Sequence, residues 1–380
     1  MELPEKLRQK MDTRRQQHAL RQLPSPNGLI DFASNDYLGF SRSEAIFSET
    51  HQYLTEHQLT QNGATGSRLI SGNHPLYDAT EKYLAEFHDS GSALIYNSGY
   101  DANVGFFSCV PQKGDFIFYD ELCHASIRDG IQLSHAKSYK FTHNDTEHLG
   151  QLILRHHSEQ AHIYVATESV FSMDGDTPPL AQVAKICEKF GAYLVVDEAH
   201  ALGVFGKNGA GVVQELQLQQ QVFARIMTFG KGLGCHGAAV IGSPELRNFL
   251  VNFSRSFIYT TGLSPHSLAT IGVAYRQLQH TDTLARLKNN IIHFNQVKTM
   301  LGLKPLFVYS KSAIQCAVIP GNEKVKAVAT ALQQKGFDVK AILSPTVPAG
   351  QERLRICLHS YNEDTQISRL LHHIADLTLT

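Results

Sequence analysis

Two residues with reactive side chains each lie at or just beyond the end of a short apolar run. Asp197 ends YLVVD (193–197), and Lys231 lies in the glycine-flanked turn TFGKGLG (228–234) after another run. In α/β proteins, ligands bind beyond the carboxyl ends of the strands, so the two side chains could face one crevice. Pyridoxal phosphate needs such a pair, a lysine for the Schiff base and an acid that keeps its pyridine nitrogen protonated. Taken one at a time, Asp197 would be an ordinary strand-end cap and Lys231 a solvated loop charge.

Other interpretations of these two motifs are weaker. Lys207 in GVFGKNGAG (203–211) lies in the loop that should leave the same strand as Asp197, so it is the weaker Schiff-base candidate. Lys231 does not belong to a phosphate loop, because that motif requires Ser or Thr directly after its lysine and this chain has Gly232. The letters DEAH (197–200) also occur in helicases, but the near-neutral charge and the lack of a Walker motif argue against one.

The composition of the chain narrows its class. It has 380 residues, with 34 basic and 35 acidic side chains and a formal charge of −1, which gives no basic footprint for nucleic acid. No apolar run approaches the roughly 20 residues of a membrane span, and the polar start lacks the apolar stretch of a signal peptide. The six cysteines never form a CxxC pair and no HExxH motif occurs, which argues against a disulfide framework and a metal site. We therefore expect an α/β protein of the reducing cytoplasm, with no nucleic-acid partner, no membrane partner and no metal.

Short apolar runs alternate with helix-like stretches between about residues 75 and 245. The runs are SALIY (92–96), FIFY (116–119), HIYVAT (162–167), YLVVD (193–197), RIMTF (225–229) and AAVIG (238–242). One face of an expected helix is formed by Leu76, Ala79, Tyr83, Leu84 and Phe87. Asn73 is its expected cap, and Pro75 lies in its first turn. This alternation predicts an α/β fold with a mostly parallel sheet covered on both faces.

The pattern of strand-like and helix-like stretches divides the chain into three segments. Residues 1–45 are expected to form an N-terminal arm and residues 46–280 a large domain. Residues 281–380 are expected to form a smaller α+β domain. Its predicted elements are IQCAVIP (314–320), a helix-like stretch (322–336), RLRICLH (353–359) and a final helix.

Five stretches of the chain resemble the α-oxoamine synthases, a family of fold-type-I enzymes that use pyridoxal 5'-phosphate. They are SNDYLGF (34–40), GATGSRLISGNHPLYDATEKYLAEFH (63–88), ESVFSMDGD (168–176), VVDEAHALGVFGKNGAG (195–211) and TFGKGLG (228–234). The resemblance implies a fold-type-I architecture in which the large domain carries the cofactor, and a homodimeric assembly. It also implies an enzyme that condenses an amino acid with an acyl thioester and releases carbon dioxide.

One further stretch, SPTVPAGQERLRICL (344–358), resembles the members of this family that act in biotin biosynthesis. These members make 8-amino-7-oxononanoate from L-alanine and a pimeloyl thioester, carried by CoA or by an acyl carrier protein. The first alternative is 2-amino-3-ketobutyrate CoA ligase, a member that joins glycine to acetyl-CoA. The second is a catalytically silent regulatory subunit, against which the presence of Lys231 argues.

The resemblance also assigns roles to residues around the cofactor ring. Lys231 would bind the cofactor covalently, Asp197 would pair with its pyridine nitrogen, and His124 in CHASIRDG would stack on the ring. Without the resemblance, His124 would be interpreted as a helix cap. Ser172 and His200 would form hydrogen bonds near the phenolic oxygen.

A second group of residues is expected at the phosphate of the cofactor. The turn in NSGYDANVG suits an anion, because the first amides of a helix point outward from its start. The expected contacts are the backbone of Gly99 and Tyr100, the side chain of Thr228, and Thr261 of the partner subunit, which lies in YTTG (259–262).

Substrate contacts are expected from Arg21, Asn35, His124, Thr346 and Arg355, and Arg355 would bind the amino-acid carboxylate in a bidentate manner.

One position departs from the family. Leu343 occupies a place just ahead of Pro-Thr-Val-Pro where an arginine is expected. A pimeloyl chain ends in a carboxylate, which is costly to bury without a partner. One possibility is that Lys340 or Arg353 supplies the positive charge that pairs with this carboxylate. Another is that the acyl end stays in solvent or arrives esterified. A third is that position 343 never touches the acyl end.

Overall fold

The computed structural model describes residues 3–21, 23, 28–156, 158 and 160–379. These residues form two compact units, which we describe separately. The larger unit comprises residues 35–172 and 177–285, and the smaller one contains the described residues up to 34, residues 173–176 and those from 286 onward. The three segments expected from the sequence remain a prediction. No helix of the described chain is long and apolar enough to cross a membrane.

A seven-stranded sheet forms the centre of the larger unit. In spatial order its strands are β2 (Ser92–Tyr96), β8 (Ala238–Gly242), β7 (Ala224–Thr228), β6 (Tyr193–Asp197), β5 (Ile163–Glu168), β3 (Phe116–Asp120) and β4 (Lys137–Phe141). Only β8 runs against its neighbours. The mostly parallel sheet predicted from the apolar runs is therefore confirmed. β4 was not predicted, because it is a polar edge strand in which Phe141 alone is fully buried.

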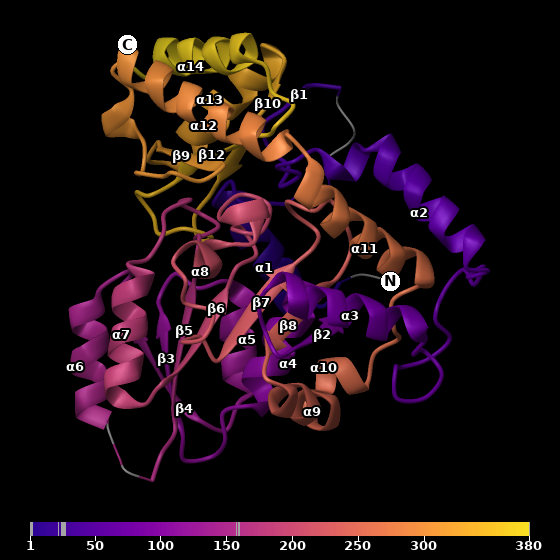
Figure 1. Cartoon of the computed structure of the whole chain (residues 1–380). Helices are drawn as coiled ribbons and strands as arrows, with labels where there is room; N and C mark the ends of the chain where they lie inside the picture. Colours follow the sequence, from indigo (N-terminus) through magenta and orange to yellow (C-terminus); the bar gives the residue numbers. More distant parts are fainter. Residues whose placement is uncertain (1–2, 22, 24–27, 157, 159, 380) are drawn as a thin grey trace. The chain divides into compact units, whose positions relative to one another are not determined.

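Helices cover both faces of this sheet. The alternation of side chains along β6 shows the two sides, since Val195 belongs to one buried cluster and Leu194 and Val196 belong to the other. The first cluster includes residues of α4 (Gly99–Cys109) and α5 (Ala125–Leu133), and the second includes residues of α6 (Thr146–His156) and α7 (Leu180–Phe190) (Figure 1). Because both faces are buried, a strand can be as apolar as YLVVD.

The start of α3 differs by one residue from the prediction. The other helices of the larger unit are α2 (Glu44–Glu56), α3 (Pro75–Phe87), α8 (Val212–Glu215), α9 (Pro244–Phe253), α10 (Arg255–Ile258) and α11 (Pro265–His280). Pro75 lies in the first turn of α3 as expected, but the cap is His74, whose side chain accepts a hydrogen bond from the backbone N–H of Leu76. The prediction that Asn73 caps this helix is wrong, because the Asn73 side chain accepts a hydrogen bond from Arg68 at 3.0 Å instead.

A three-stranded antiparallel sheet and several helices form the smaller unit. The strands are β11 (Lys340–Ile342), β12 (Arg353–Cys357) and β9 (Ile314–Val318), and β1 (Ile30–Asp31) pairs in parallel with β10 (Phe337–Asp338). The helices are α1 (Glu5–Gln16), most of α12 (Thr283–Met300), α13 (Asn322–Gln334) and α14 (Asp364–Thr378). The strands and helices predicted from residue 314 onward are confirmed.

Candidate active site

The carboxyl ends of the parallel strands meet at one edge of the large sheet. Residue pairing places Glu168 at the end of β5 beside Asp197 at the end of β6, and Asp197 beside Ile226 of β7. β7 continues to Thr228, and Lys231 follows in the next turn. The structure thus brings the strands that lead to Asp197 and Lys231 together at one edge.

Lys231 is half-buried in the turn after β7, and its amine contacts a histidine. Its Nζ lies 2.7 Å from Nε2 of His200, which is buried. Gly232 permits this turn, because a Cβ at that position would collide with the carbonyl oxygen of Leu202. Lys207, the rival lysine, is exposed in the short 3-10 helix η2 (Lys207–Gly209).

Asp197 is buried, and its carboxylate is held from two directions. Its Oδ2 accepts a hydrogen bond from the side-chain amide of Asn103 at 2.8 Å, and its Oδ1 accepts one from the backbone N–H of Ala199 at 2.9 Å. Asn103 lies on α4 and also donates to the hydroxyl of Ser126 on α5, at 3.1 Å. These neutral donors orient the carboxylate without cancelling its charge, which suits a partner for a protonated ring nitrogen.

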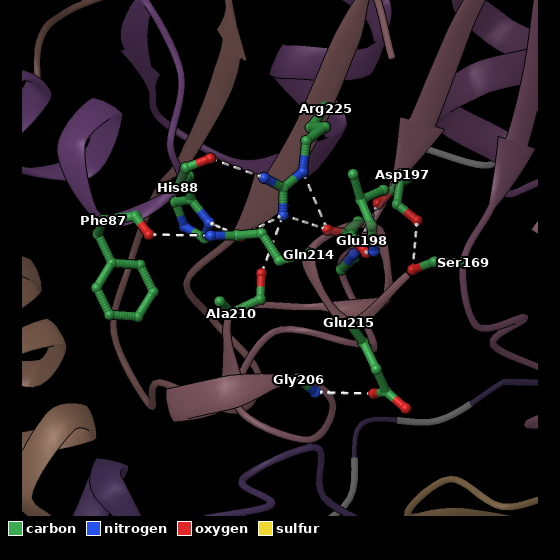
Figure 2. A network of polar contacts seen from close by, with 12 residues as sticks. Phe87, His88, Ser169, Asp197, Glu198, Gly206, Ala210, Gln214, Glu215 and Arg225 are labelled. Atoms are coloured by element: carbon green, nitrogen blue, oxygen red, sulfur yellow. Dashed lines mark hydrogen bonds and ion pairs between the residues drawn. The ribbon is translucent and has the colours of Figure 1, made fainter. Parts of the chain in front are cut away.

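A buried ion pair begins at the residue after Asp197 (Figure 2). The guanidinium of Arg225 contacts Oε2 of Glu198 through Nη2 at 2.5 Å and through Nε at 3.1 Å, and both residues are buried. Arg225 also donates to the carbonyl oxygen of Ala210 at 2.9 Å. A Cβ at Gly211 would collide with Oε2 of Glu198, so the segment that closes over the pair needs glycine there. The ion pair therefore fixes the turn that follows β6 and, through the backbone, the orientation of Asp197.

The turn between β2 and α4 offers hydrogen-bond donors to an anion. Ser98 caps α4 by accepting a hydrogen bond from the backbone N–H of Asp101, while the preceding amides of Gly99 and Tyr100 have no intrahelical acceptor. A Cβ at Gly99 would collide with Oγ1 of Thr228, so the start of the helix and the end of β7 are in close contact. Two helix-start amides beside a hydroxyl fit the phosphate of the predicted cofactor.

Thr261 is exposed, and hydrogen bonds connect its segment to the turn between β2 and α4 (residues 97–100) of the same chain. The side-chain amide of Asn97 donates to the carbonyl oxygen of Thr261 at 2.7 Å and to the hydroxyl of Thr260 at 3.0 Å. A contact from Thr261 to a partner subunit remains a prediction.

His124 caps α5, which is the role that the sequence suggests without the family resemblance. Its Nδ1 accepts a hydrogen bond from the backbone N–H of Ser126 at 3.2 Å, and its own backbone N–H donates to Oε1 of Glu168 at 2.6 Å. Burial lowers the pKa of His124, although the charge of Asp197 opposes this effect. This shift favours the neutral imidazole, whose Nδ1 is held by the backbone N–H of Ser126, and its stacking on a cofactor ring remains a prediction.

Glu168 is a buried acid at the end of β5. Burial raises the pKa of Glu168 well above its usual range, and the charge of Asp197 raises it further. This direction favours the protonated form of Glu168, which adds no negative charge beside Asp197. Ser172, which is expected to act with His200, is also buried in the larger unit, and its role remains a prediction.

The residues expected to bind substrate fall in both units. Asn35 belongs to the larger unit, where its Oδ1 accepts a hydrogen bond from the hydroxyl of Tyr37 at 3.2 Å. Arg21, Thr346 and Arg355 belong to the smaller unit. There the Arg21 guanidinium donates to the Thr346 hydroxyl at 3.5 Å. Their contacts with substrate remain predictions.

Both bases that could replace the missing arginine already pair with an acid. Lys340 donates to Asp338 at 2.7 Å, and the guanidinium of Arg353 forms an ion pair with Asp174. Leu343 is half-buried. These pairings favour an acyl end that stays in solvent or arrives esterified, or a position 343 that does not touch it.

Four polar residues of this site were missed by the sequence analysis: Tyr37, Asn103, Ser126 and Glu168. Glu168 had a signal, because it directly follows the apolar run HIYVAT just as Asp197 ends YLVVD. Tyr37 lies in the stretch SNDYLGF (34–40), but nothing in the local sequence indicates its contact with His200, which is distant in sequence.

The chain is similar to known proteins over most of its length. The family model described as aminotransferase class I and II matches residues 27–374. The 8-amino-7-oxononanoate synthase of Emericella nidulans is 39% identical over 373 residues, which covers 92% of this chain and 89% of that protein. The solved serine palmitoyltransferase of Sphingomonas wittichii has a TM-score of 0.89 at 28% identity, covering 99% of this chain and 98% of that one. The solved 8-amino-7-oxononanoate synthase of Francisella tularensis has a TM-score of 0.78 at 29% identity, covering 92% and 98%.

Proposed function

Because the chain belongs to the aminotransferase class I and II family, we propose that it condenses L-alanine with a pimeloyl thioester to give 8-amino-7-oxononanoate. It is a fold-type-I, pyridoxal-phosphate-dependent acyltransferase. The observation that carries the proposal is the meeting of Asp197 and the Lys231 turn at one sheet edge, in a chain 39% identical to an 8-amino-7-oxononanoate synthase. The thioester carrier would be CoA or an acyl carrier protein, and the product would enter biotin biosynthesis.

The residues at the sheet edge fit the cofactor. Lys231 would bind it covalently and Asp197 would hold the proton on its ring nitrogen. The amides of Gly99 and Tyr100 and the hydroxyl of Thr228 would bind its phosphate. When bound, pyridoxal phosphate supplies an electron sink that stabilises negative charge on the α-carbon of an amino acid.

The chain's own groups move the protons of the reaction. Once the incoming amino acid has released its amine, Nζ of Lys231 would take the proton from the α-carbon of L-alanine. That carbon would then form a bond to the thioester carbonyl carbon while the carbon–sulfur bond breaks. The thiol leaves, the carboxylate departs as carbon dioxide, and a proton takes its place on the α-carbon. His124, fixed at Nδ1 by Ser126, would orient the carboxylate and supply that proton.

We further propose that the active form is a homodimer of the cytoplasm, in which Thr261 of the partner subunit contributes to each phosphate site. All six cysteines are free thiols, which suits a reducing compartment.

A second candidate is supported by the comparison of structures. The serine palmitoyltransferase has the higher TM-score, 0.89 against 0.78, while the oxononanoate synthase of Emericella nidulans has the higher identity, 39% against 28%. One experiment separates the two, together with the glycine-dependent ligase. The protein loaded with cofactor is incubated with L-alanine, L-serine or glycine and with acetyl-, octanoyl-, pimeloyl- or palmitoyl-CoA, and products are identified by mass spectrometry. We expect 8-amino-7-oxononanoate from alanine and pimeloyl-CoA; a product from serine and palmitoyl-CoA, or only from glycine and acetyl-CoA, would replace this proposal.

A further inference from the structure

A chain of four hydrogen-bonded side chains ends at the amine of Lys231. Nζ of Lys231 lies 2.7 Å from Nε2 of His200, and Nδ1 of His200 lies 2.7 Å from the hydroxyl of Tyr37. The Tyr37 hydroxyl also donates to Oδ1 of Asn35, at 3.2 Å. Because each link is a hydrogen bond, the proton position in one group constrains the next.

Asn35, the residue farthest from Lys231, determines which group donates in each of these hydrogen bonds. Oδ1 of Asn35 can only accept, so the hydrogen bond between it and Tyr37 requires that the single proton of the Tyr37 hydroxyl points toward Oδ1. The oxygen of Tyr37 then accepts a hydrogen bond from Nδ1–H of His200. A neutral imidazole with its proton on Nδ1 carries its lone pair on Nε2, and Nε2 is the atom that faces Lys231.

Close packing holds Tyr37 against the lysine turn. Tyr37 is fully buried. The turn that follows it contacts the loop of Lys231, because a Cβ at Gly234 would collide with the backbone nitrogen of Ser41. Asp36 fastens the same turn by accepting hydrogen bonds from the backbone N–H of Ser41 at 3.1 Å and from its hydroxyl at 2.5 Å. Tyr37 therefore cannot move away from His200 without displacing the lysine loop.

We propose that Asn35 and Tyr37 are positioning residues that hold His200 as the proton acceptor of Lys231. An N–H bond of the Lys231 ammonium breaks and an N–H bond forms at Nε2 of His200. The resulting imidazolium donates Nδ1–H to the oxygen of Tyr37. Lys231 is left as the neutral amine, the form that would hold the cofactor covalently, with the carbonyl oxygen leaving as water. This inference rests on the proposed role of Lys231 as the cofactor-binding lysine.

The test follows His200 and the loading of the cofactor in the full chain, and neither measurement needs a substrate. Nitrogen-15 NMR of histidine-labelled protein, with His200→Gln to identify the signal, should show a wild-type His200 protonated at Nδ1. Tyr37→Phe removes the acceptor of that proton. We expect the proton to move to Nε2 and the rate of covalent cofactor binding, followed by absorbance, to fall at least about tenfold.

Variants of Asn35 test the same series of hydrogen bonds at the residue farthest from Lys231. Asn35→Asp keeps an acceptor for Tyr37 and should preserve the Nδ1 tautomer of His200. Asn35→Leu removes the acceptor and should behave as Tyr37→Phe does. Asn35→Leu also keeps the inference testable if Tyr37→Phe fails to fold.

Tyr275→Phe is the matched control. Tyr275 is buried and its hydroxyl lies 3.0 Å from Nε2 of His88, so this variant also removes a buried tyrosine–histidine hydrogen bond, but at another place. It should leave both readouts unchanged. The inference is overturned if wild-type His200 carries its proton on Nε2, or if Tyr37→Phe loads the cofactor as fast as Tyr275→Phe. A failure of the proposed condensation alone would leave both readouts as expected, because neither uses an amino acid or a thioester.

Discussion

Replacing Arg225 with methionine tests whether the buried ion pair after β6 supports the site. In the wild type, Oε2 of Glu198 faces two guanidinium nitrogens at 2.5 and 3.1 Å, and the two residues are 0% and 3% exposed. Arg225→Met leaves the Glu198 carboxylate buried without its cation. Removal of one partner from a buried pair costs roughly 3–5 kcal/mol of unfolding free energy.

This loss is large enough to measure by calorimetry of the full chain at saturating cofactor. At about 2–4 °C per kcal/mol for a unit of this size, the Tm should fall by roughly 6–20 °C. The affinity for the cofactor, measured below that Tm, should also fall, because the turn that orients Asp197 loses its anchor.

A double variant distinguishes the loss of stability caused by the unpaired buried charge from the loss caused by poorer packing. Glu198→Gln with Arg225→Met removes both charges, so it should recover a large part of the lost stability. Arg247→Met is the control, since its ion pair with Glu81 is about one-third exposed on the arginine side and should contribute about 1 kcal/mol or less. The reasoning is refuted if the double variant is as unstable as Arg225→Met, or if Arg225→Met is no less stable than Arg247→Met.

Four further predictions address the site and the smaller unit. Borohydride should fix the cofactor to the peptide that contains TFGKGLG and Lys231, and recovery of the label on Lys207 would contradict the assignment. Asp197→Asn should lower turnover at least ~10²-fold, the scale of a lost electrostatic contact in an active site; near-normal turnover would make Asp197 only a strand-end cap. Burial lowers the pKa of Lys298 to about 8, beside the rings of Phe294 and Phe307. The folded state therefore binds fewer protons than the unfolded state between about pH 8 and 10.5, so wild-type stability should rise with pH in that window. Lys298→Met should stabilise the protein most below pH 8 and progressively less above it, and a stability difference that does not change with pH would contradict this sign. Leu343→Arg should improve free-acid pimeloyl-CoA selectively over its methyl ester and octanoyl-CoA if position 343 lies near the acyl carboxylate, whereas an equal response of all three would show that the position is structural.

The strands that position the site could be predicted because their signal is local. Runs such as YLVVD are apolar at successive positions, since β6 is covered on both faces of the sheet. β4 has no such run, because at the sheet edge only Phe141 is buried. The cap of α3 was missed by one residue, since His74 and Asn73 both carry a side-chain acceptor and lie next to each other before Pro75.

The polar contacts of the site could not be predicted because their partners are distant in sequence. Asn103 reaches Asp197 across 94 positions, and Tyr37 reaches His200 across 163. Each contact depends on the packing of a helix or turn against the edge of the sheet, and no local pattern encodes that packing. Asp197 and Lys231 could be proposed from the sequence because one ends a recognisable strand and the other follows one, whereas the groups that orient them have no such local signal.

The run DEAH shows why these orienting groups matter for function. Asp197 at the sheet edge is held by Asn103 of α4, while its neighbour Glu198 is buried with Arg225. The same turn then places His200 against Lys231. One short backbone segment thus carries Glu198, which is anchored in the core, and the two residues proposed to serve the cofactor, Asp197 for its ring nitrogen and His200 as the proton acceptor of Lys231. A substitution in the anchor should therefore affect both cofactor-facing groups through the backbone. Arg225→Met is accordingly expected to disturb the loading rate that depends on His200 as well as the affinity that depends on Asp197. A variant that lost stability but kept both would show that the anchor supports the fold alone.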